Sequence, residues 1–474
     1  MSGVIAAGAY LPRHRLDRAT IAATLGGRPG RGTRSVACFD EDTTTLGVEA
    51  ARIALASAPA DSAPDALYFA TAGPAYLDKT NATAIHAALD LDRTVSAIDV
   101  AGSVRSGAGA LRIGLQSPAP ALVILADICT GLPGGADERD GGDAGAALLL
   151  SGGEGPFIAE QLAHAATTGE FLDRWRIPGR ATSHRWVEQF GGDVYLELGQ
   201  QALAAALERA GVQAAAVDRL LVSGTHGRAV SRLGKDSGVP AEALAPDLAG
   251  SIGNTGTAHA GLLLSAALEQ AGAGETIALV VLGDGAEAFV FRTTPAIGQW
   301  RSAHAVAGQL AGAGVTEVPY GRFLSWRGQL TPEPTRRPAP APPVAPASHR
   351  TEGWKFAFHG CRCLACEAIQ VPPQRVCHTC RTADRMETVR LADRHATVVT
   401  STVDRLAWSP SPPSTFAILD LDGGGRVQLE VTDVELGAVA PGQRMELTFR
   451  RAFTQGDIHN YLWKARPLIE RKDS

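Results

Sequence analysis

Four cysteines near residue 370 constrain this 474-residue chain more than any other feature. They form two pairs with the same internal spacing, Cys363-x2-Cys366 and Cys377-x2-Cys380. Two such pairs, each in a tight turn, present four thiolates to one tetrahedral Zn²⁺. A site closed by four cysteines has no open position for chemistry, so the pattern predicts a structural zinc site within a small ribbon. Cys361 lies two residues before the first ligand, out of register, and is not expected to bind the metal.

A proline-rich segment at residues 331–347, TPEPTRRPAPAPPVAPA, separates the cysteines from everything before them. Proline fixes φ and removes an amide donor, so this density of proline predicts an extended, semi-rigid linker. The length of the chain points the same way, because 474 residues exceed what one ordinary core organises. The sequence therefore predicts separate folded units on the two sides of the linker.

The region before the linker alternates strand-like and helix-like segments. Ala66–Thr71 and Leu122–Asp127 are predicted strands, and Tyr195–Gly211 is a predicted helix. The region also repeats one pattern: an apolar strand, then Gly-Asp with small residues, then a second apolar strand. The pattern occurs at 122–150 and again at 277–291. Gly-Asp turns also recur by chance in α/β proteins, but two copies closing halves of similar length favour a duplicated α/β domain.

Composition and charge exclude several classes of protein. Hydrophobic residues make up 45% and charged residues 20% of the chain, as in soluble globular proteins. The net charge of −5 gives no reason to expect nucleic acid or an anionic membrane as partner. No segment reaches the roughly 18 apolar residues of a membrane-spanning helix, and the N-terminus has no secretory signal pattern. Cys38, Cys129 and Cys361 are scattered, so a disulfide framework is not expected and a reducing cytoplasm is the expected location.

Short strand-like segments follow the cysteines to the end of the chain. Turn residues at Gly423–Gly425 and Pro441-Gly442 separate them, which predicts a small β-barrel. The five predicted strands are Ala396–Thr402, Thr415–Leu421, Arg426–Val431, Met445–Phe449 and Asn460–Lys464.

This C-terminal region resembles the rubredoxin-like zinc ribbon plus OB-fold family that accompanies thiolase-type enzymes. The resemblance implies a zinc ribbon at 351–385, an OB-fold at 386–474, and a module that helps to bind or channel acyl-CoA beside a condensing enzyme. An OB-fold alone could instead bind oligonucleotides, but the sequence lacks an evident basic, aromatic face. The segments that carry the resemblance are Phe358–Cys363, Pro372–Cys377, Gly423–Arg426, Thr432-Asp433, Pro441-Gly442 and Tyr461–Lys464.

Residues 1–297 resemble the thiolase superfamily, in particular 3-hydroxy-3-methylglutaryl-CoA synthases and type III ketoacyl-carrier-protein synthases. The resemblance implies a five-layered αβαβα duplication with halves at about 1–165 and 190–297, in agreement with the repeat, and a homodimer formed through the central sheets. Residues 298–350 would then connect this domain to the ribbon. The matching segments are Gly8–Arg13, Asp40–Thr44 and Gly253-Asn254.

The resemblance also implies two catalytic residues. In the family, a histidine and an asparagine polarise a thioester carbonyl and stabilise an enolate. His226, in the sequence Ser-Gly-Thr-His, matches the histidine, and Asn254, in Ile-Gly-Asn-Thr-Gly, matches the asparagine. A lone histidine or asparagine is more often structural, but finding both in family order favours a catalytic pair.

The family's cysteine nucleophile is absent. In the family it stands at the N-terminus of a buried helix, where the helix dipole favours the thiolate. Anchoring the family pattern on Asp99 and Leu111 places Val104 at that position, and valine cannot form an acyl-enzyme. Ser103 and Ser106 lie beside it, but a serine needs an activating base and helix geometry turns each away from the direction of Val104. Roles as N-cap and small packing residue are favoured for the two serines.

Other family features are also missing or ambiguous. The acid/base glutamate of hydroxymethylglutaryl-CoA synthases would fall near Ala72, so that specific activity is not expected, although the enolate-stabilising pair is unaffected. Packing roles are expected for Cys129, at a strand end, and for His259, five residues after the predicted asparagine. The aromatic and charged segment Phe171–Trp186 either shapes an acyl pocket or makes a dimer contact.

Together these features predict a condensing-type acyltransferase that acts on acyl-CoA or acyl-carrier-protein thioesters. His226 and Asn254 would stabilise an enolate made by decarboxylation or deprotonation, and a C–C bond would form or break without an acyl-enzyme. Placing both reactants in one pocket can lower a barrier by about 7 kcal/mol or more. Secondary or polyketide-like biosynthesis suits this reaction by analogy.

The alternative is a non-catalytic acyl-CoA-binding subunit that supports a partner condensing enzyme. The expected cofactor is structural Zn²⁺ and the expected substrate a CoA thioester, with neither nucleic acid nor membrane as partner.

Overall fold

The computed structural model describes residues 1–186, 188–312 and 315–468, so the last six residues of the predicted OB-fold lie outside it. It contains two compact units that do not simply follow the order of the chain, because two short segments of the N-terminal half pack with the C-terminal half. The first unit comprises Met1–Ala37, Leu46–Thr83 and Arg93–Phe323, and the second comprises Cys38–Thr45, Ala84–Asp92 and the described residues from Leu324 onward.

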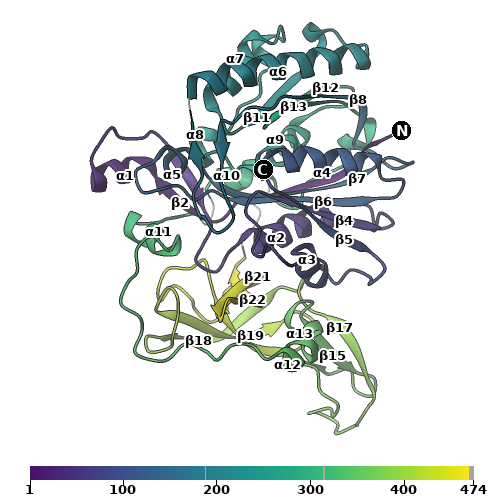
Figure 1. The fold of residues 1–474 in the computed structure, drawn as a ribbon. Coiled ribbons are helices and arrows are strands. Elements are labelled where there is room, and N and C mark those ends of the chain that lie inside the picture. Colours follow the sequence, from purple (N-terminus) through teal and green to yellow (C-terminus); the bar gives the residue numbers. More distant parts are fainter. Residues whose placement is uncertain (187, 313–314, 469–474) are drawn as a thin grey trace. The chain divides into compact units, whose positions relative to one another are not determined.

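The first unit is built on one sheet with the strand order β11-β12-β13-β8-β1-β7-β6-β4-β5 (Figure 1). The order contains the predicted duplication. In β4-β6-β7-β1 and again in β11-β12-β13-β8, one parallel pair is followed by two antiparallel pairs. The strands are β1 (Gly3–Tyr10), β4 (Ala66–Thr71), β5 (Ser96–Ala101), β6 (Ala121–Ile128), β7 (Asp143–Ser151), β8 (Ala159–Thr168), β11 (Arg219–Gly224), β12 (Thr276–Leu282) and β13 (Gly285–Thr293).

Helices complete the layers of the first unit. Two helices, α4 (Arg105–Gln116) and α9 (Thr257–Gln270), lie between the two halves of the sheet and contact strands of both halves. The long helix α6 (Glu188–Ala210) covers the outer face of β8 and β13, and α7 (Gly227–Asp236) packs beside it (Figure 1). The helix α2 (Thr43–Ala56) lies on the outer side of the other half (Figure 1). This arrangement is the predicted αβαβα fold.

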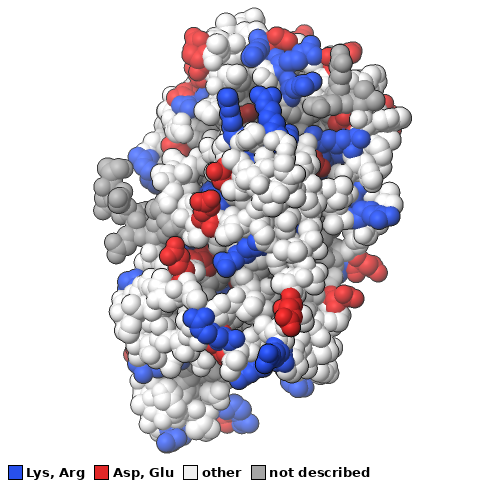
Figure 2. Space-filling model, turned by 90° about the vertical axis from the view of Figure 1, so that its left-hand side faces the viewer, with Lys and Arg blue, Asp and Glu red and all other residues white. Residues whose placement is uncertain are grey.

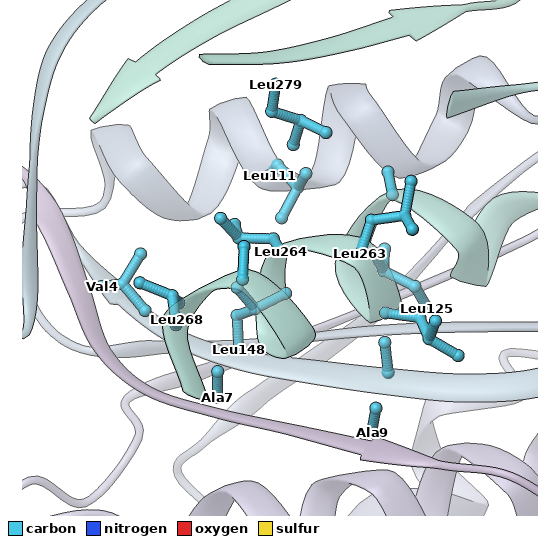
Figure 3. Packing of buried hydrophobic residues seen from close by; sticks show 14 of the residues in the cluster. Val4, Ala7, Ala9, Leu111, Leu125, Leu148, Leu263, Leu264, Leu268 and Leu279 are labelled. Atoms are coloured by element: carbon cyan, nitrogen blue, oxygen red, sulfur yellow. The ribbon is translucent and has the colours of Figure 1, made fainter. Parts of the chain in front are cut away.

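Leucine side chains from the two central helices form the middle of the core (Figure 3). Leu111 of α4 and Leu264 of α9 are each 1% exposed, and they pack among Leu125, Leu148 and Leu279 from the sheet strands. Burying a leucine side chain contributes about 1.5–3 kcal/mol. The core therefore holds the start of α4, where the nucleophile was expected, in a fixed place against the sheet.

The first unit extends beyond the boundary expected at residue 297. Its short strand β14 (Thr316–Glu317) pairs in parallel with β2 (His14–Asp17), which keeps the chain in this unit through Phe323. The smaller elements before the linker are α1 (Arg18–Leu25), β3 (Thr33–Val36), α3 (Ala82–Leu89), α5 (Ala136–Asp140), β9 (Arg174–Trp175), β10 (His184–Arg185), α8 (Ala249–Ile252), α10 (Val306–Leu310) and α11 (Tyr320–Trp326).

The second unit contains the predicted ribbon and barrel. The ribbon sheet has the order β16-β15-β17, and five strands close into a barrel in the order β18-β19-β20-β22-β21. The linker is extended as predicted except at its end, where α12 begins at Ala345, so the prediction was wrong for the last three residues. The elements are α12 (Ala345–Arg350), α13 (Glu352–Lys355), β15 (His359–Cys363), β16 (Ile369–Gln370), β17 (Met386–Arg390), β18 (Ala396–Asp404), β19 (Ser414–Leu421), β20 (Arg426–Val431), β21 (Arg444–Gln455) and β22 (Ile458–Pro467).

Buried ion pairs fix the segment Cys38–Thr45 to the barrel inside the second unit. The Arg450 guanidinium lies 3.1 Å from Asp40, and the Lys464 ammonium lies 3.0 Å from the same carboxylate. Glu41 and Asp433 complete the surroundings of Arg450. All of these side chains are almost fully buried, so the unpaired charge left by removing any one of them would be costly.

Charge on the visible surface is mixed. On the face drawn in Figure 2, basic and acidic side chains are interspersed among wide uncharged areas. Within the part of the chain that the structure describes, no helix combines the length and the hydropathy needed to cross a membrane.

Candidate active site

His226 lies two residues after β11, at the N-cap of α7. Its Nδ1 atom accepts a hydrogen bond from the Ala229 amide at 3.2 Å, and the side chain is buried, with 8% exposed. An Nδ1 that accepts must be unprotonated in the neutral ring, so the ring proton is on Nε2. The helix cap therefore orients the imidazole so that Nε2 is a hydrogen-bond donor.

Asn254 is held from both sides of its amide group. Its Nδ2 donates to the Gly224 carbonyl at 2.6 Å, and its Oδ1 accepts from the Gly256 amide at 3.0 Å. These two bonds fix which end of the amide is NH2 and leave the second N–H of that group for another acceptor. Gly224 is the last residue of β11, two positions before His226, so Asn254 is tied to the end of the strand that leads to His226.

Asp127, at the end of β6, ties the neighbouring strand ends to the Asn254 loop. One carboxylate oxygen accepts from the Thr71 hydroxyl and the Ala72 amide, both at 2.8 Å, and the other accepts from the Thr257 amide at 2.7 Å. Burial raises the pKa of this carboxyl group, while the hydrogen bonds oppose that shift. Sequence reasoning gave Asp127 no role, although a polar residue at the end of an apolar strand was a usable signal.

Val104 stands at the N-cap of α4, three residues after the end of β5, and makes no side-chain cap bond. The expectation that a serine caps this helix was wrong. Ser103 precedes the cap, and Ser106 lies in the first turn, where its hydroxyl accepts from the Ser103 amide at 3.3 Å. Among the described residues, no hydrogen bond joins either serine hydroxyl to a histidine, lysine or carboxylate. The first turn of α4 lies against the Asn254 loop, since a Cβ added at Gly107 would come within 3.0 Å of Thr257.

Arg105 anchors the first turn of α4 to the other half of the sheet, and sequence reasoning missed it. Its guanidinium donates to the Asp284 carbonyl at 2.6 Å and to the Thr168 hydroxyl at 2.9 Å, and it lies 3.5 Å from Glu287. Glu287 also pairs with His164 at 2.7 Å. Burial raises the pKa of Glu287, but His164 and Arg105 outweigh burial, and the pKa is lowered overall. Arg105, the residue after Val104, thus holds the N-terminal end of α4 in place.

Cys129 and His259 have properties of packing residues. Cys129 lies 3.4 Å from the Asn254 carbonyl, yet burial, with the nearby Asp127 and Asp143, raises the pKa of its thiol to about 11. A thiol with that pKa is protonated at neutral pH and is a poor nucleophile. Burial lowers the pKa of His259 to about 4, so its ring is neutral at pH 7.

The segment Phe171–Trp186 forms the small hairpin of β9 and β10 near the strand ends. Trp175 stacks on His184 with ring centroids 5.5 Å apart, and the Arg176 guanidinium donates to the Ala72 carbonyl. The family's acid/base glutamate was expected near Ala72. The Arg176 guanidinium therefore contacts the backbone in the region where this sequence lacks the family's glutamate.

The four paired cysteines converge in the second unit. Their sulfur atoms all lie within 4.8 Å of one another, with 3.6 Å between Cys363 and Cys380 and 3.6 Å between Cys366 and Cys377. Four ligands about 2.3 Å from a tetrahedral zinc ion are about 3.8 Å apart, so the cluster fits Zn²⁺. Cys361 is outside the cluster, where its sulfur accepts from the Gln374 amide at 3.2 Å.

The duplicated layers, with two helices between the halves of the sheet, define a thiolase-like α/β fold. An HMG-CoA synthase complexed with CoA matches with a TM-score of 0.58 and 20% identity, over 68% of this chain and 89% of that chain. The HMG synthase of the curacin biosynthetic pathway, in complex with apo donor-ACP, matches with a TM-score of 0.58 and 18% identity, over 69% of this chain and 88% of that one. These likenesses confirm the predicted fold.

The hydroxymethylglutaryl-CoA synthase of Methanocella arvoryzae is 30% identical to this chain over 306 residues, which cover 62% of this chain and 87% of that protein. The chain therefore belongs to the hydroxymethylglutaryl-CoA synthase family. The family model described as "ChsH2, C-terminal OB-fold domain" matches residues 388–450, which confirms the predicted OB-fold.

Proposed function

We propose that this protein is a condensing-type acyltransferase that forms or breaks a C–C bond through a stabilised enolate, without a covalent acyl-enzyme. One observation carries the proposal: two oriented donors, His226 Nε2 and Asn254 Nδ2, stand at the end of β11, while valine occupies the N-cap of the adjacent central helix.

The two donors would act on the carbonyl oxygen of a bound thioester. When a carboxylate on the neighbouring carbon leaves as CO₂, the electrons of the broken C–C bond form an enolate, whose oxygen accepts from both N–H groups. Donors fixed before the reaction stabilise that charge without reorganising, and one such donor is worth roughly 10²–10³ in rate. The enolate carbon then attacks a second carbonyl or takes up a proton.

The second acyl group would be held without a covalent bond. Val104 offers no nucleophile, and neither neighbouring serine has a base among the described residues. CoA thioesters and acyl-carrier proteins are the proposed substrates, because relatives were solved with CoA and with a donor-ACP. A biosynthetic, polyketide-like setting is part of the same proposal. In the second unit, Cys363, Cys366, Cys377 and Cys380 would hold one structural Zn²⁺.

A homodimer through β5 belongs to the proposal as well. β5 is the edge strand of the large sheet, and its Ile98 side chain is 46% exposed. An edge strand with unpaired amide and carbonyl groups and an exposed apolar side chain invites pairing with a second copy. Light scattering of the full-length protein at micromolar concentration should give the mass of a dimer, and a monomer would contradict this part.

The alternative is a non-catalytic acyl-CoA-binding subunit, favoured by the absence of both the cysteine and the glutamate at Ala72. Incubation of the full-length protein with malonyl-CoA, acetyl-CoA and acetoacetyl-CoA, followed by product mass spectrometry, separates the two. We expect turnover that His226→Ala reduces at least about 100-fold. His349→Ala, at a histidine whose side chain is 83% exposed, is the matched control and should leave turnover unchanged. Binding of CoA thioesters without turnover would favour the alternative.

A further inference from the structure

A small cavity in the second unit has aromatic walls. Its volume is about 290 Å³, and no part of the chemistry proposed above uses it. Ligand sites in proteins are concave, mostly apolar and marked by a few placed polar groups, with volumes from about 300 Å³ upward. This cavity has that composition at the lower end of the size range. Its main lining residues are Phe39, Trp326, Trp408, Pro410, Arg451 and Phe453.

The cavity lies at the loops that OB-folds use for ligands. Trp408 and Pro410 belong to the loop between β18 and β19, the first two barrel strands. Phe453 belongs to the end of β21, next to the turn into β22, the last two strands. The loops between strands 1 and 2 and between strands 4 and 5 are among the places where OB-folds bind oligonucleotides and oligosaccharides. The remaining walls come from Phe39 and from Trp326 at the end of α11.

The rings form two pairs that a flat ligand can contact. Phe39 and Trp326 lie with centroids 6.1 Å apart at 51°, and Trp408 and Phe453 lie 6.4 Å apart at 88°. The Trp326 indole N–H donates to the Ser411 hydroxyl at 3.2 Å, which fixes that ring. Fixed aromatic faces bind nucleobases by stacking, at about 1–3 kcal/mol per base.

Arg451 supplies positive charge at the cavity wall. One of its terminal nitrogens donates to the Phe39 carbonyl at 3.2 Å, and the other lies 3.8 Å from Asp42. A guanidinium has five N–H groups, so others can serve a phosphate oxygen. The side chain is 26% exposed, which keeps it accessible from solvent.

We infer that this cavity binds the nucleobase of a phosphorylated nucleotide. Its volume suits one base rather than a strand. The inference rests on the second unit alone. Under the proposed function, the source of the base is CoA, whose adenine and phosphates have the required chemistry, while a free adenine nucleotide is the other source.

The test uses the full-length protein with CoA, AMP and oligo(dT) as probes, followed by tryptophan fluorescence and calorimetry. We expect CoA and AMP to bind, and Trp408→Leu to weaken both by about 10-fold, which corresponds to loss of one stacking contact. Trp408→Phe keeps an aromatic face and should restore most of the affinity. Leu406→Ala, in the same loop but with a side chain 65% exposed and outside the cavity, is the matched control and should bind as wild type does.

Equal affinity in Trp408→Leu, or no binding of either CoA or AMP, would overturn the inference, and so would binding of oligo(dT) without binding of AMP. Binding of AMP but not CoA would support the site and remove CoA as its source. Phe453→Leu repeats the test from the opposite wall if Trp408→Leu fails to fold. His226→Ala should leave AMP binding unchanged, so failure of the proposed chemistry and failure of this site are distinguishable.

Discussion

The cysteine cluster of the ribbon and the N-terminus of α4 are two places where the sequence led us to look for thiolate chemistry. In the ribbon all four ligands are present and their sulfurs converge. At α4 the thiol is replaced by Val104, while the oriented His226 and Asn254 remain at the end of β11. A metal site depends on its complete ligand set. Under the proposed function, by contrast, carbonyl polarisation by His226 and Asn254 would persist without a nucleophile at Val104.

Replacing a ribbon ligand should have the largest effect. Cys377→Ser removes a thiolate from the zinc set, and because zinc binding and folding of such a ribbon are coupled, the ribbon should lose both the ion and its fold. Elemental analysis should give about one zinc per wild-type chain and far less in the variant, with a lower Tm. Cys361→Ser is the matched control, because Cys361 is outside the cluster and serine can still accept from the Gln374 amide. Equal zinc content in all three proteins would contradict the site.

Replacing a buried charge of the second unit should have the next largest effect. Burial raises the pKa of Asp40, but Lys464 and Arg450 outweigh burial and hold the pKa well below its usual range. Asp40→Asn leaves the two cations with less compensation and should reduce the free energy of unfolding by about 3 kcal/mol in a denaturant titration. Asp420→Asn is the matched control, because Asp420 pairs with Arg426 on the surface, and it should change little.

The depressed pKa of Asp40 also predicts how the stability of the protein depends on pH. Because the folded-state pKa of Asp40 is depressed, its contribution to stability is complete above the unfolded-state pKa of about 3.9. That contribution is lost as the pH falls from there toward the folded-state pKa. The difference in stability between wild type and Asp40→Asn should therefore be constant from pH 5 to pH 7 and shrink below about pH 4. A difference that grows on acidification would contradict this assignment.

Local patterns predicted the second unit better than the site of the first. The cysteine spacing and the alternating strands act over a few residues, so the ribbon, the barrel and all five barrel strands were predicted. Asp127 was missed because its partner Thr257 is 130 residues away, and Arg105 because its partner Asp284 is 179 residues away. Partners that distant leave no local pattern that identifies them, and for Asp127 the sequence offered only the signal of a polar residue at the end of an apolar strand. The helix at Ala345 was missed because proline density hides a helix start, where proline is tolerated.

The smallest expected effect tests the comparison most directly, by adding a thiol at Val104. The N-terminus of a helix lowers the pKa of a cysteine thiol, so Val104→Cys should be partly thiolate at neutral pH and attack a bound thioester. Intact-protein mass spectrometry after exposure to acetyl-CoA should show one acyl adduct on a fraction of the variant and none on the wild type. Ser106→Cys, in the same first turn but turned away from Val104, is the matched control and should stay unlabelled.

Labelling of Ser106→Cys but not of Val104→Cys would move the nucleophile position. A serine adduct on the wild type would replace the non-covalent mechanism by a covalent one. Acylation confined to Val104→Cys would mean that thioester binding at this helix does not depend on a cysteine, because the site needs only the thiol to capture the acyl group.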